Sequence, residues 1–125
     1  LEHKQEIDLY GLPLDLNIDL YIQSNELGSF KFYTSREDGE LIGYAAYFIY
    51  MCPHHKTSVQ ATQDIVYYKK EKRGNGLPFM SYCEGELKKL GVQFIKIGVP
   101  ASFDWSPILI RKGFSKLETT YVKEL

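Results

Sequence analysis

The sequence predicts a single domain of the mixed α/β class, built as layers of helix and sheet. Three strand-like segments follow one another with short connections, which is typical of an antiparallel meander. A basic, glycine-containing stretch then leads into an amphipathic helix, and strand and helix patterns alternate after it. The length of 125 residues suits one domain, spanning residues 1–125.

The composition is that of a globular protein with enough apolar surface to form a core without disulfides or a structural metal. Hydrophobic residues make up 44% and aromatic residues 14%, which excludes disorder over most of the chain. A net charge of −1 gives no electrostatic case for nucleic acid or an acidic membrane. Two cysteines suit a reducing compartment, and no basic segment followed by an apolar run opens the chain, so we expect a cytoplasmic protein.

The first half of the chain predicts one helix and three strands. Phe30, Phe32 and Thr34 alternate with polar residues, and the apolar run that ends at Met51 is typical of a strand buried on both faces. Ser35–Gly39 is predicted as a turn and Pro53–Ser58 as a polar loop. The expected elements are a helix at Asp15–Asn25 and strands at Phe30–Thr34, Leu41–Met51 and Val59–Tyr68.

The second half predicts alternating helices and strands. Met80, Leu87 and Leu90 form a stripe at helical spacing that begins near Leu77, and Gly91 is placed to end that helix. The expected elements after it are a strand at Phe94–Val99, a helix at Ser106–Lys112, and a last strand pair from Gly113-Phe114 to Tyr121–Leu125.

The stretch Lys69–Pro78 is the segment whose residue types imply a ligand. It lies where a strand meets a helix, and the unpaired amides of a helix N-terminus attract anions. Gly74 and Gly76 allow the backbone to curl around a phosphate, in the most basic part of the chain. A tight turn with a solvated charge run is the alternative. Leu77-Pro78 after the second glycine excludes a Walker-type loop, and Phe79 argues against a dinucleotide-binding fingerprint.

With this loop the chain resembles the GNAT superfamily of acyl-CoA-dependent N-acetyltransferases over about residues 15–125. The family motif Arg/Gln-x-x-Gly-x-Gly/Ala is matched by Arg73-Gly74-Asn75-Gly76-Leu77-Pro78 except at its last position. Asp38-Gly39-Glu40-Leu41-Ile42-Gly43-Tyr44 and the closing Gly113-Phe114 fit the same pattern. His54-His55 and Gln63-Asp64 are similar to GNAT proteins of phages and prophages, whose first strand and helix we expect to precede Leu1.

The resemblance implies a GNAT-like central sheet, mixed but mostly antiparallel, flanked by helices and with one splayed strand pair. Acetyl-CoA is the implied cosubstrate. Its pantetheine arm would bind backbone groups of Val66, Tyr67 and Tyr68. The implied pyrophosphate contacts are Arg73, Gly74, Asn75, Gly76, Leu77 and Pro78. Pro78 lacks the amide that a glycine or alanine offers, so we expect a re-aimed contact there.

For catalysis the resemblance points to the strand before the loop. Asp64 and Thr62 occupy the family's base positions, and Asp64 is the better base because a carboxylate accepts a proton directly or through water. A carboxylate that bridges neighbouring loops is the alternative for Asp64. Leu109 stands where the family places a tyrosine that helps the leaving thiolate, and Ser102 corresponds to an asparagine. Tyr82 or Tyr121 are the other donors considered, and a mechanism without an acid stays open.

Two other constellations have less specific signals. Cys52-Pro53-His54-His55 carries zinc-ligand types, but a structural site needs four ligands and no second cluster exists, so no metal is expected. We expect His54 and His55 to lie at the lip of an acceptor cleft or in solvent. Cys83 falls inside the helix after the loop, which indicates a core residue rather than a nucleophile.

The predicted function is therefore N-acetyl transfer from acetyl-CoA to a primary amine, by direct attack in a ternary complex. The acceptor stays open between a small amine, a peptide N-terminus and a protein lysine. The alternative is a catalytically degenerate GNAT-fold module that binds CoA or a partner protein. The family frequently pairs through exposed strands or helices, so a homodimer is among the expected states, with no membrane partner and no nucleic acid.

Overall fold

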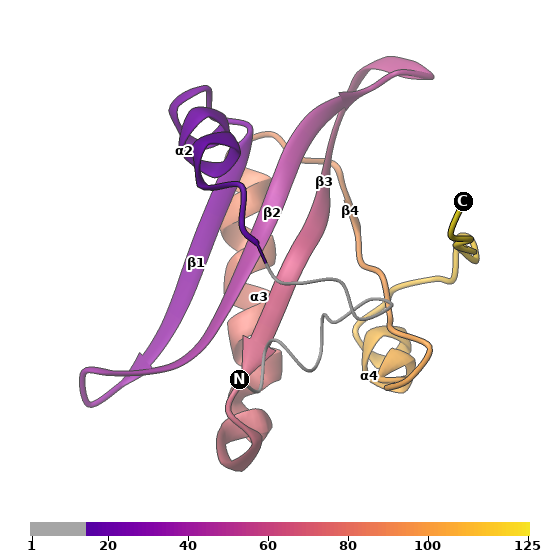
Figure 1. Ribbon diagram of the computed structural model, residues 1–125. Helices are drawn as coiled ribbons and strands as arrows, with labels where there is room; N and C mark the ends of the chain where they lie inside the picture. The colour runs from indigo at the N-terminus through magenta and orange to yellow at the C-terminus, as the bar shows by residue number, and fades with distance from the viewer. Residues whose placement is uncertain (1–14) are drawn as a thin grey trace.

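The computed structural model describes residues 15–125, which form a four-stranded sheet with helices on both faces (Figure 1). The strand order is β1-β2-β3-β4. The first three strands are antiparallel neighbours, and β4 runs parallel to β3. The predicted mixed α/β class with a mostly antiparallel sheet is confirmed. The strands are β1 (Phe30–Glu37), β2 (Glu40–Cys52), β3 (His55–Tyr68) and β4 (Phe94–Lys96).

The meander consists of two hairpins whose turns are shorter than predicted. Asp38 and Gly39 alone connect β1 to β2, and both have a positive φ, as tight hairpin turns require. The predicted loop Pro53–Ser58 is wrong in its second part, because β3 already begins at His55. The polar residues there did not indicate a strand, yet they continue the ladder of the long hairpin.

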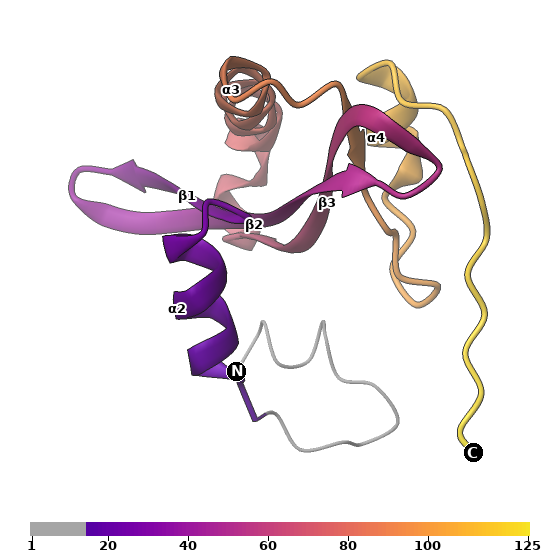
Figure 2. The ribbon, with the colours of Figure 1, turned by 90° about the horizontal axis from the view of Figure 1, so that it is seen from above.

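Helix α3 (Gly76–Lys89) packs on one face of the sheet and α2 (Ile18–Glu26) lies on the other, as Figure 2 shows. Phe79, Cys83 and Leu87 recur every four residues on α3 and are buried against the sheet. Leu90, predicted in the same stripe, lies just beyond the helix and is half exposed. Gly91, with φ of 88°, ends the helix as predicted while Val92 N donates to Leu87 O.

The last helix, α4 (Ser106–Arg111), lies beside α3, and Lys112 Nζ reaches Glu84 at 3.0 Å. The strand pair predicted from Gly113 to Leu125 is absent from the described chain. Gly113 has φ of 94° and Phe114 N donates to Leu109 O, so this pair ends α4 rather than beginning a strand. The residues beyond it belong to no strand of the described sheet, and Tyr121 is 89% exposed.

The predicted strand Phe94–Val99 is also shorter than expected, because β4 ends at Lys96. Residues 97–105 leave the sheet and run to α4 as a loop. Within residues 15–125, no helix has both the length and the apolar character needed to cross a membrane.

Candidate active site

A cavity of about 610 Å³ opens where β3 and β4 separate. The two strands pair over three residues only, from Gln60 opposite Phe94 to Thr62 opposite Lys96. Strand β3 continues to Tyr68, whereas the chain after Lys96 turns away into the loop 97–105. The splayed strand pair is therefore present. The first turn of α3 and α4 form the other walls of the cavity between the two strands.

The β3 wall of the cavity is formed by the residues predicted to hold a pantetheine arm. Val66, Tyr67 and Tyr68 all line it. On the β2 side these residues pair with Gly43–Ala45, while beyond Thr62 no described strand pairs with β3 on the cavity side. An extended ligand with amide groups could continue the sheet there. The Tyr68 carbonyl already accepts a hydrogen bond from Arg73 Nε at 3.0 Å, so a ligand would have to share it.

The predicted glycine loop is a 3-10 helix, η1 (Lys70–Asn75), which continues directly into α3. Lys72 N donates to Lys69 O and Gly76 N donates to Arg73 O, so the segment is closed by bonds of 3-10 type. Gly76 has an ordinary helical φ of −67°. The prediction of a loop was wrong. Glycines permit backbone conformations that other residues rarely adopt, but they do not require them, and Gly76 adopts a helical one.

The 3-10 period sorts the basic residues of this segment onto two sides. Side chains three apart lie above one another in such a helix, and Lys70, Arg73 and Gly76 all line the cavity. Lys72 is bonded instead to Glu37 of the β1–β2 hairpin at 3.1 Å. Lys69 likewise pairs with Glu40, and this holds the pKa of Glu40 below its usual value. The cavity therefore has a cationic end, formed by Lys70 and Arg73.

The motif residues are not all brought to the cavity. Leu77 lines it together with Gly76, and a Cβ built on Gly74 or Gly76 would meet no protein atom within 4 Å. Gly74 is exposed and does not belong to the lining, and Asn75 ends η1.

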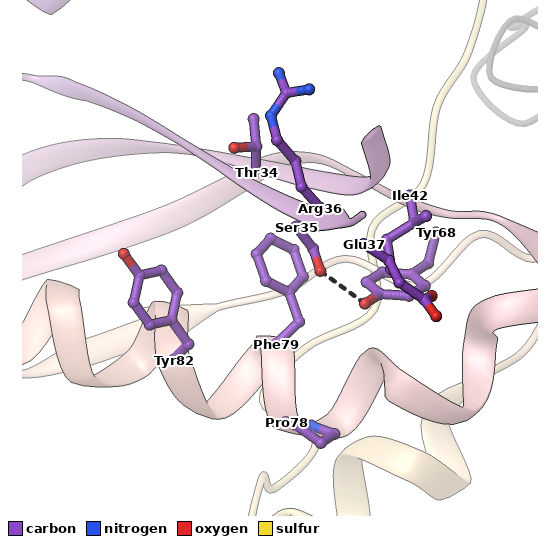
Figure 3. Close-up of a pocket in the computed structure, with 9 residues that line it drawn as sticks. All are labelled: Thr34, Ser35, Arg36, Glu37, Ile42, Tyr68, Pro78, Phe79 and Tyr82. Carbon is purple, nitrogen blue, oxygen red and sulfur yellow. Dashed lines mark hydrogen bonds between the residues drawn. The ribbon is translucent and has the colours of Figure 1, made fainter. Parts of the chain in front are cut away.

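Pro78 lies on the other side of the first turn of α3. There it lines a second hollow of about 440 Å³, between α3 and the end of β1 (Figure 3). Tyr68 and Phe79 line both spaces, with their ring centroids 5.8 Å apart, so this ring pair separates the hollow from the cavity.

Asp64 also lines the cavity, at a break in the β2–β3 ladder. Ala46 pairs with Ile65 and Tyr47 with Gln63, so Asp64 is the extra residue of a β-bulge. Its Oδ2 accepts a hydrogen bond of 2.8 Å from the hydroxyl of Tyr21 on α2. Burial of the phenol, and then the hydrogen bond to Asp64 and its charge, raise the pKa of Tyr21 to about 12. No sequence pattern indicated Tyr21 as a partner of Asp64, since the two residues are 43 positions apart.

The other candidates are placed as follows. Thr62 lies two residues before Asp64, and its hydroxyl is 3.1 Å from that of Tyr50. His54 and His55 are exposed at the tip of the β2–β3 hairpin and do not line the cavity. Within residues 15–125, no three His, Cys, Asp or Glu side chains gather as a metal site requires.

The candidate thiolate donors are mostly remote from the cavity. Leu109 is buried on α4, and its neighbour Ile108 faces the cavity in its place. Tyr82 borders the second hollow, and Tyr121 is exposed on the C-terminal segment. Ser102 is the one such candidate that lines the cavity.

Sequence reasoning missed part of the cavity wall, namely the loop 97–105. Phe103 and Trp105 line the cavity from this loop, and the Arg73 guanidinium carbon lies 5.6 Å from the centroid of the Phe103 ring. Gly98 within the predicted strand and Pro100 directly after it were the available signal that the chain leaves the sheet here.

Several solved structures with the same arrangement are acetyltransferases. An aminoglycoside acetyltransferase from an uncultured soil metagenomic sample, in complex with trehalose, has a TM-score of 0.73 at 8% identity, covering 98% of this chain and 82% of that one. A predicted acetyltransferase from Clostridium acetobutylicum, with acetyl-CoA, has a TM-score of 0.71 at 18% identity, covering 97% and 83%. The chain has the GNAT fold.

A third structure of this fold is glucosamine-6-phosphate N-acetyltransferase from Arabidopsis thaliana, with a TM-score of 0.70 at 14% identity, covering 98% of this chain and 86% of that one. No protein-family model and no curated protein matches the sequence. At these identities the GNAT likeness concerns the fold, and the chemistry must be argued from the cavity itself.

Proposed function

We propose that this chain is a GNAT N-acetyltransferase that transfers an acetyl group from acetyl-CoA to a primary amine. The observation that carries the proposal is the cavity between the separated strands. It combines a stretch of β3 that has no described strand on its cavity side, a cationic end at Lys70 and Arg73, and a carboxylate at Asp64. For this reaction the protein must bind the amide-containing arm and the diphosphate of acetyl-CoA, and it must supply a proton acceptor. Each of these requirements has a matching part of the cavity wall.

The residues fit acetyl-CoA in two further respects. Gly74 and Gly76 have no side chain of their own, and a Cβ at either position would have open surroundings, which leaves room for a ligand beside the backbone. The N-terminal end of α3 also carries partial positive charge, which adds to that of Lys70 and Arg73. A structure of similar fold was solved with acetyl-CoA.

In the proposed reaction the amine nitrogen forms the new N–C bond while the C–S bond of the thioester breaks. Asp64 takes the proton that the amine loses, and the electron pair of the broken bond leaves with sulfur, which then takes a proton from water. No tyrosine is needed for this last step. This agrees with the presence of a buried leucine, Leu109, at the position where the resemblance implies a tyrosine. The described cysteines are both buried, which favours direct attack over a covalent acyl-enzyme.

For the acceptor we propose a small molecule with a primary amine. The support comes from the aminoglycoside and glucosamine-6-phosphate acetyltransferases, which are named for amino-sugar substrates. Both share their fold with nearly the whole of this chain. A peptide N-terminus and a protein lysine are the competing acceptors, and they belong in the same panel.

The binding test is calorimetric titration with acetyl-CoA. Gly76→Glu places a carboxylate at the cationic end of the cavity, and the surroundings of its Cβ are open, so we expect the Kd to rise by about tenfold or more while the protein stays folded. Gly85→Glu is the matched control, because Gly85 is exposed on α3, has equally open surroundings and does not line the cavity. Equal binding by both variants would contradict the proposed site.

The activity test follows thiol release from acetyl-CoA with amino sugars, polyamines and lysine peptides. We expect Asp64→Asn to lower kcat by about 100-fold or more without changing acetyl-CoA binding. Binding of acetyl-CoA without thiol release for any amine would favour the degenerate module instead.

A further inference from the structure

The contact between Tyr21 and Asp64 joins a helix on one face of the sheet to the wall of the cavity. Tyr21 Oη lies 2.8 Å from Asp64 Oδ2, and Tyr21 itself does not line the cavity. Among the described residues, Tyr21 is the one whose hydrogen bond to the Asp64 side chain is seen. One carboxylate oxygen is therefore held, and the other is left for a ligand. A bond of this kind to a charged acceptor is stronger than one between neutral groups.

The Tyr21 ring is itself fixed by aromatic packing. Its centroid is 5.1 Å from that of Phe30, edge to face, and 5.9 Å from that of Phe48, stacked. These rings come from β1 and β2, so the hydroxyl position is set by the sheet as well as by α2. The phenol also stays protonated at any pH at which the protein would act, since its pKa is raised to about 12.

Asp64 needs such support because of where it lies. It is exposed, and as the extra residue of a bulge it lacks a directly opposed residue on β2. An exposed carboxylate on an irregular backbone samples several rotamers unless a partner selects one.

We propose that Tyr21 is the positioning residue of the site, which holds the Asp64 carboxylate in one orientation so that its remaining oxygen accepts the proton of the amine. This rests on the proposed function, in which Asp64 is the base. Tyr21 does not line the cavity, so its proposed role is exerted only through Asp64.

The test is a double-mutant cycle with thiol release as the readout. Tyr21→Phe removes the hydroxyl and keeps the ring between Phe30 and Phe48, so the fold and the KM for acetyl-CoA should stay within about twofold while kcat falls about tenfold. In the Asp64→Asn background the same substitution should change kcat by less than about twofold, because the base on which it acts is gone.

Tyr50→Phe is the matched control. Tyr50 also points a hydroxyl at β3, bonding Thr62 two residues before Asp64, and the kcat of this variant should stay within about twofold. Equal losses in Tyr21→Phe and Tyr50→Phe, or a Tyr21 effect that persists in Asp64→Asn, would show a general structural role and overturn the proposal.

The two possible failures are distinguishable. If Asp64→Asn lowers kcat and Tyr21→Phe does not, the base stands and the positioning role is wrong. If Asp64→Asn leaves kcat unchanged, the base assignment in the proposed function fails, and the role of Tyr21 fails with it. Thermal unfolding of all variants checks that α2 stays packed on the sheet.

Discussion

Arg73 lies over the ring of Phe103, with its guanidinium carbon 5.6 Å from the ring centroid. Its Nε also donates to the carbonyl of Tyr68 at the end of β3. One side chain therefore ties the last residue of β3 to the loop 97–105, two segments that form facing parts of the cavity wall. Arg73 contributes both charge and shape to the site.

This relationship predicts unequal effects of two substitutions at Arg73. Arg73→Ala removes the charge and both contacts, so the affinity for acetyl-CoA should fall by about tenfold or more. Arg73→Lys keeps the charge but lacks the planar fork that serves the carbonyl and the ring together, so its affinity should be intermediate. Calorimetry with acetyl-CoA measures both.

The control for Arg73 is its neighbour Lys72. Lys72 is paired with Glu37 outside the cavity, so Lys72→Ala should change the Kd by less than about twofold. A loss as large as that of Arg73→Ala would mean that the basic segment is not divided into two sides.

Gly43 gives a prediction about stability. It pairs with Tyr68 across β2 and β3, and a Cβ at Gly43 would overlap the Tyr68 ring. Because Tyr68 packs against Phe79 in the core, the ring has little room to move, and Gly43→Ala should cost about 1–3 kcal/mol of unfolding free energy. Urea unfolding measures this cost, and acetyl-CoA affinity should fall with it.

The same substitution at Gly85 should have the opposite sign. Gly85 is exposed within α3 and has open surroundings, so Gly85→Ala should gain about 0.5–1 kcal/mol by reducing the entropy of the unfolded chain. A stabilised Gly43→Ala variant would show that the Tyr68 ring is free to shift.

Local sequence patterns predicted those parts of the fold that local physics determines. The alternation from Phe30 and the apolar run to Met51 became β1 and β2, and Gly91 ended α3. The stretch Val66–Tyr68, which lines the cavity, was indicated by the family resemblance that the motif at Arg73–Pro78 carries.

The parts that were mispredicted depend on distant partners. The segment after Gly113 was predicted as a strand pair but has no described strand beside it, and a strand in a sheet needs a neighbour with which to pair. His55 joined β3 because the β2 ladder extends to Cys52. The contacts of Asp64 with Tyr21 and of Arg73 with Phe103 join residues far apart in sequence, which no periodicity reveals.

Tyr21 predicts a pH dependence of stability. Its pKa is raised from 10.0 to about 12, so between these values the folded state keeps a proton that the unfolded state releases. The free energy of unfolding should therefore fall as the pH rises through this window. Tyr21→Phe should show a smaller fall, because other groups with raised pKa values, such as Tyr33 and Tyr47, are common to both proteins.

Urea unfolding of the two proteins from pH 9 to pH 11.5 isolates the Tyr21 contribution as a difference. Asp64→Asn should reduce this difference as well, since the hydrogen bond and the charge of Asp64 are two of the three causes of the shift. Parallel curves for wild type and Tyr21→Phe would contradict the contact.

Cys83 allows the route of acetyl transfer to be tested. Its side chain is fully buried in the core between α3 and the sheet, and burial raises the pKa of the thiol to about 11, so the nucleophilic thiolate is nearly absent at pH 8. In the native protein N-ethylmaleimide should leave Cys83 unmodified, and unfolding in urea should expose it. Since an acyl-enzyme needs an accessible thiolate, Cys83→Ala should keep its kcat within about twofold if it folds. Acetylated Cys83 in a peptide digest, after incubation with acetyl-CoA alone, would replace direct attack by a two-step route.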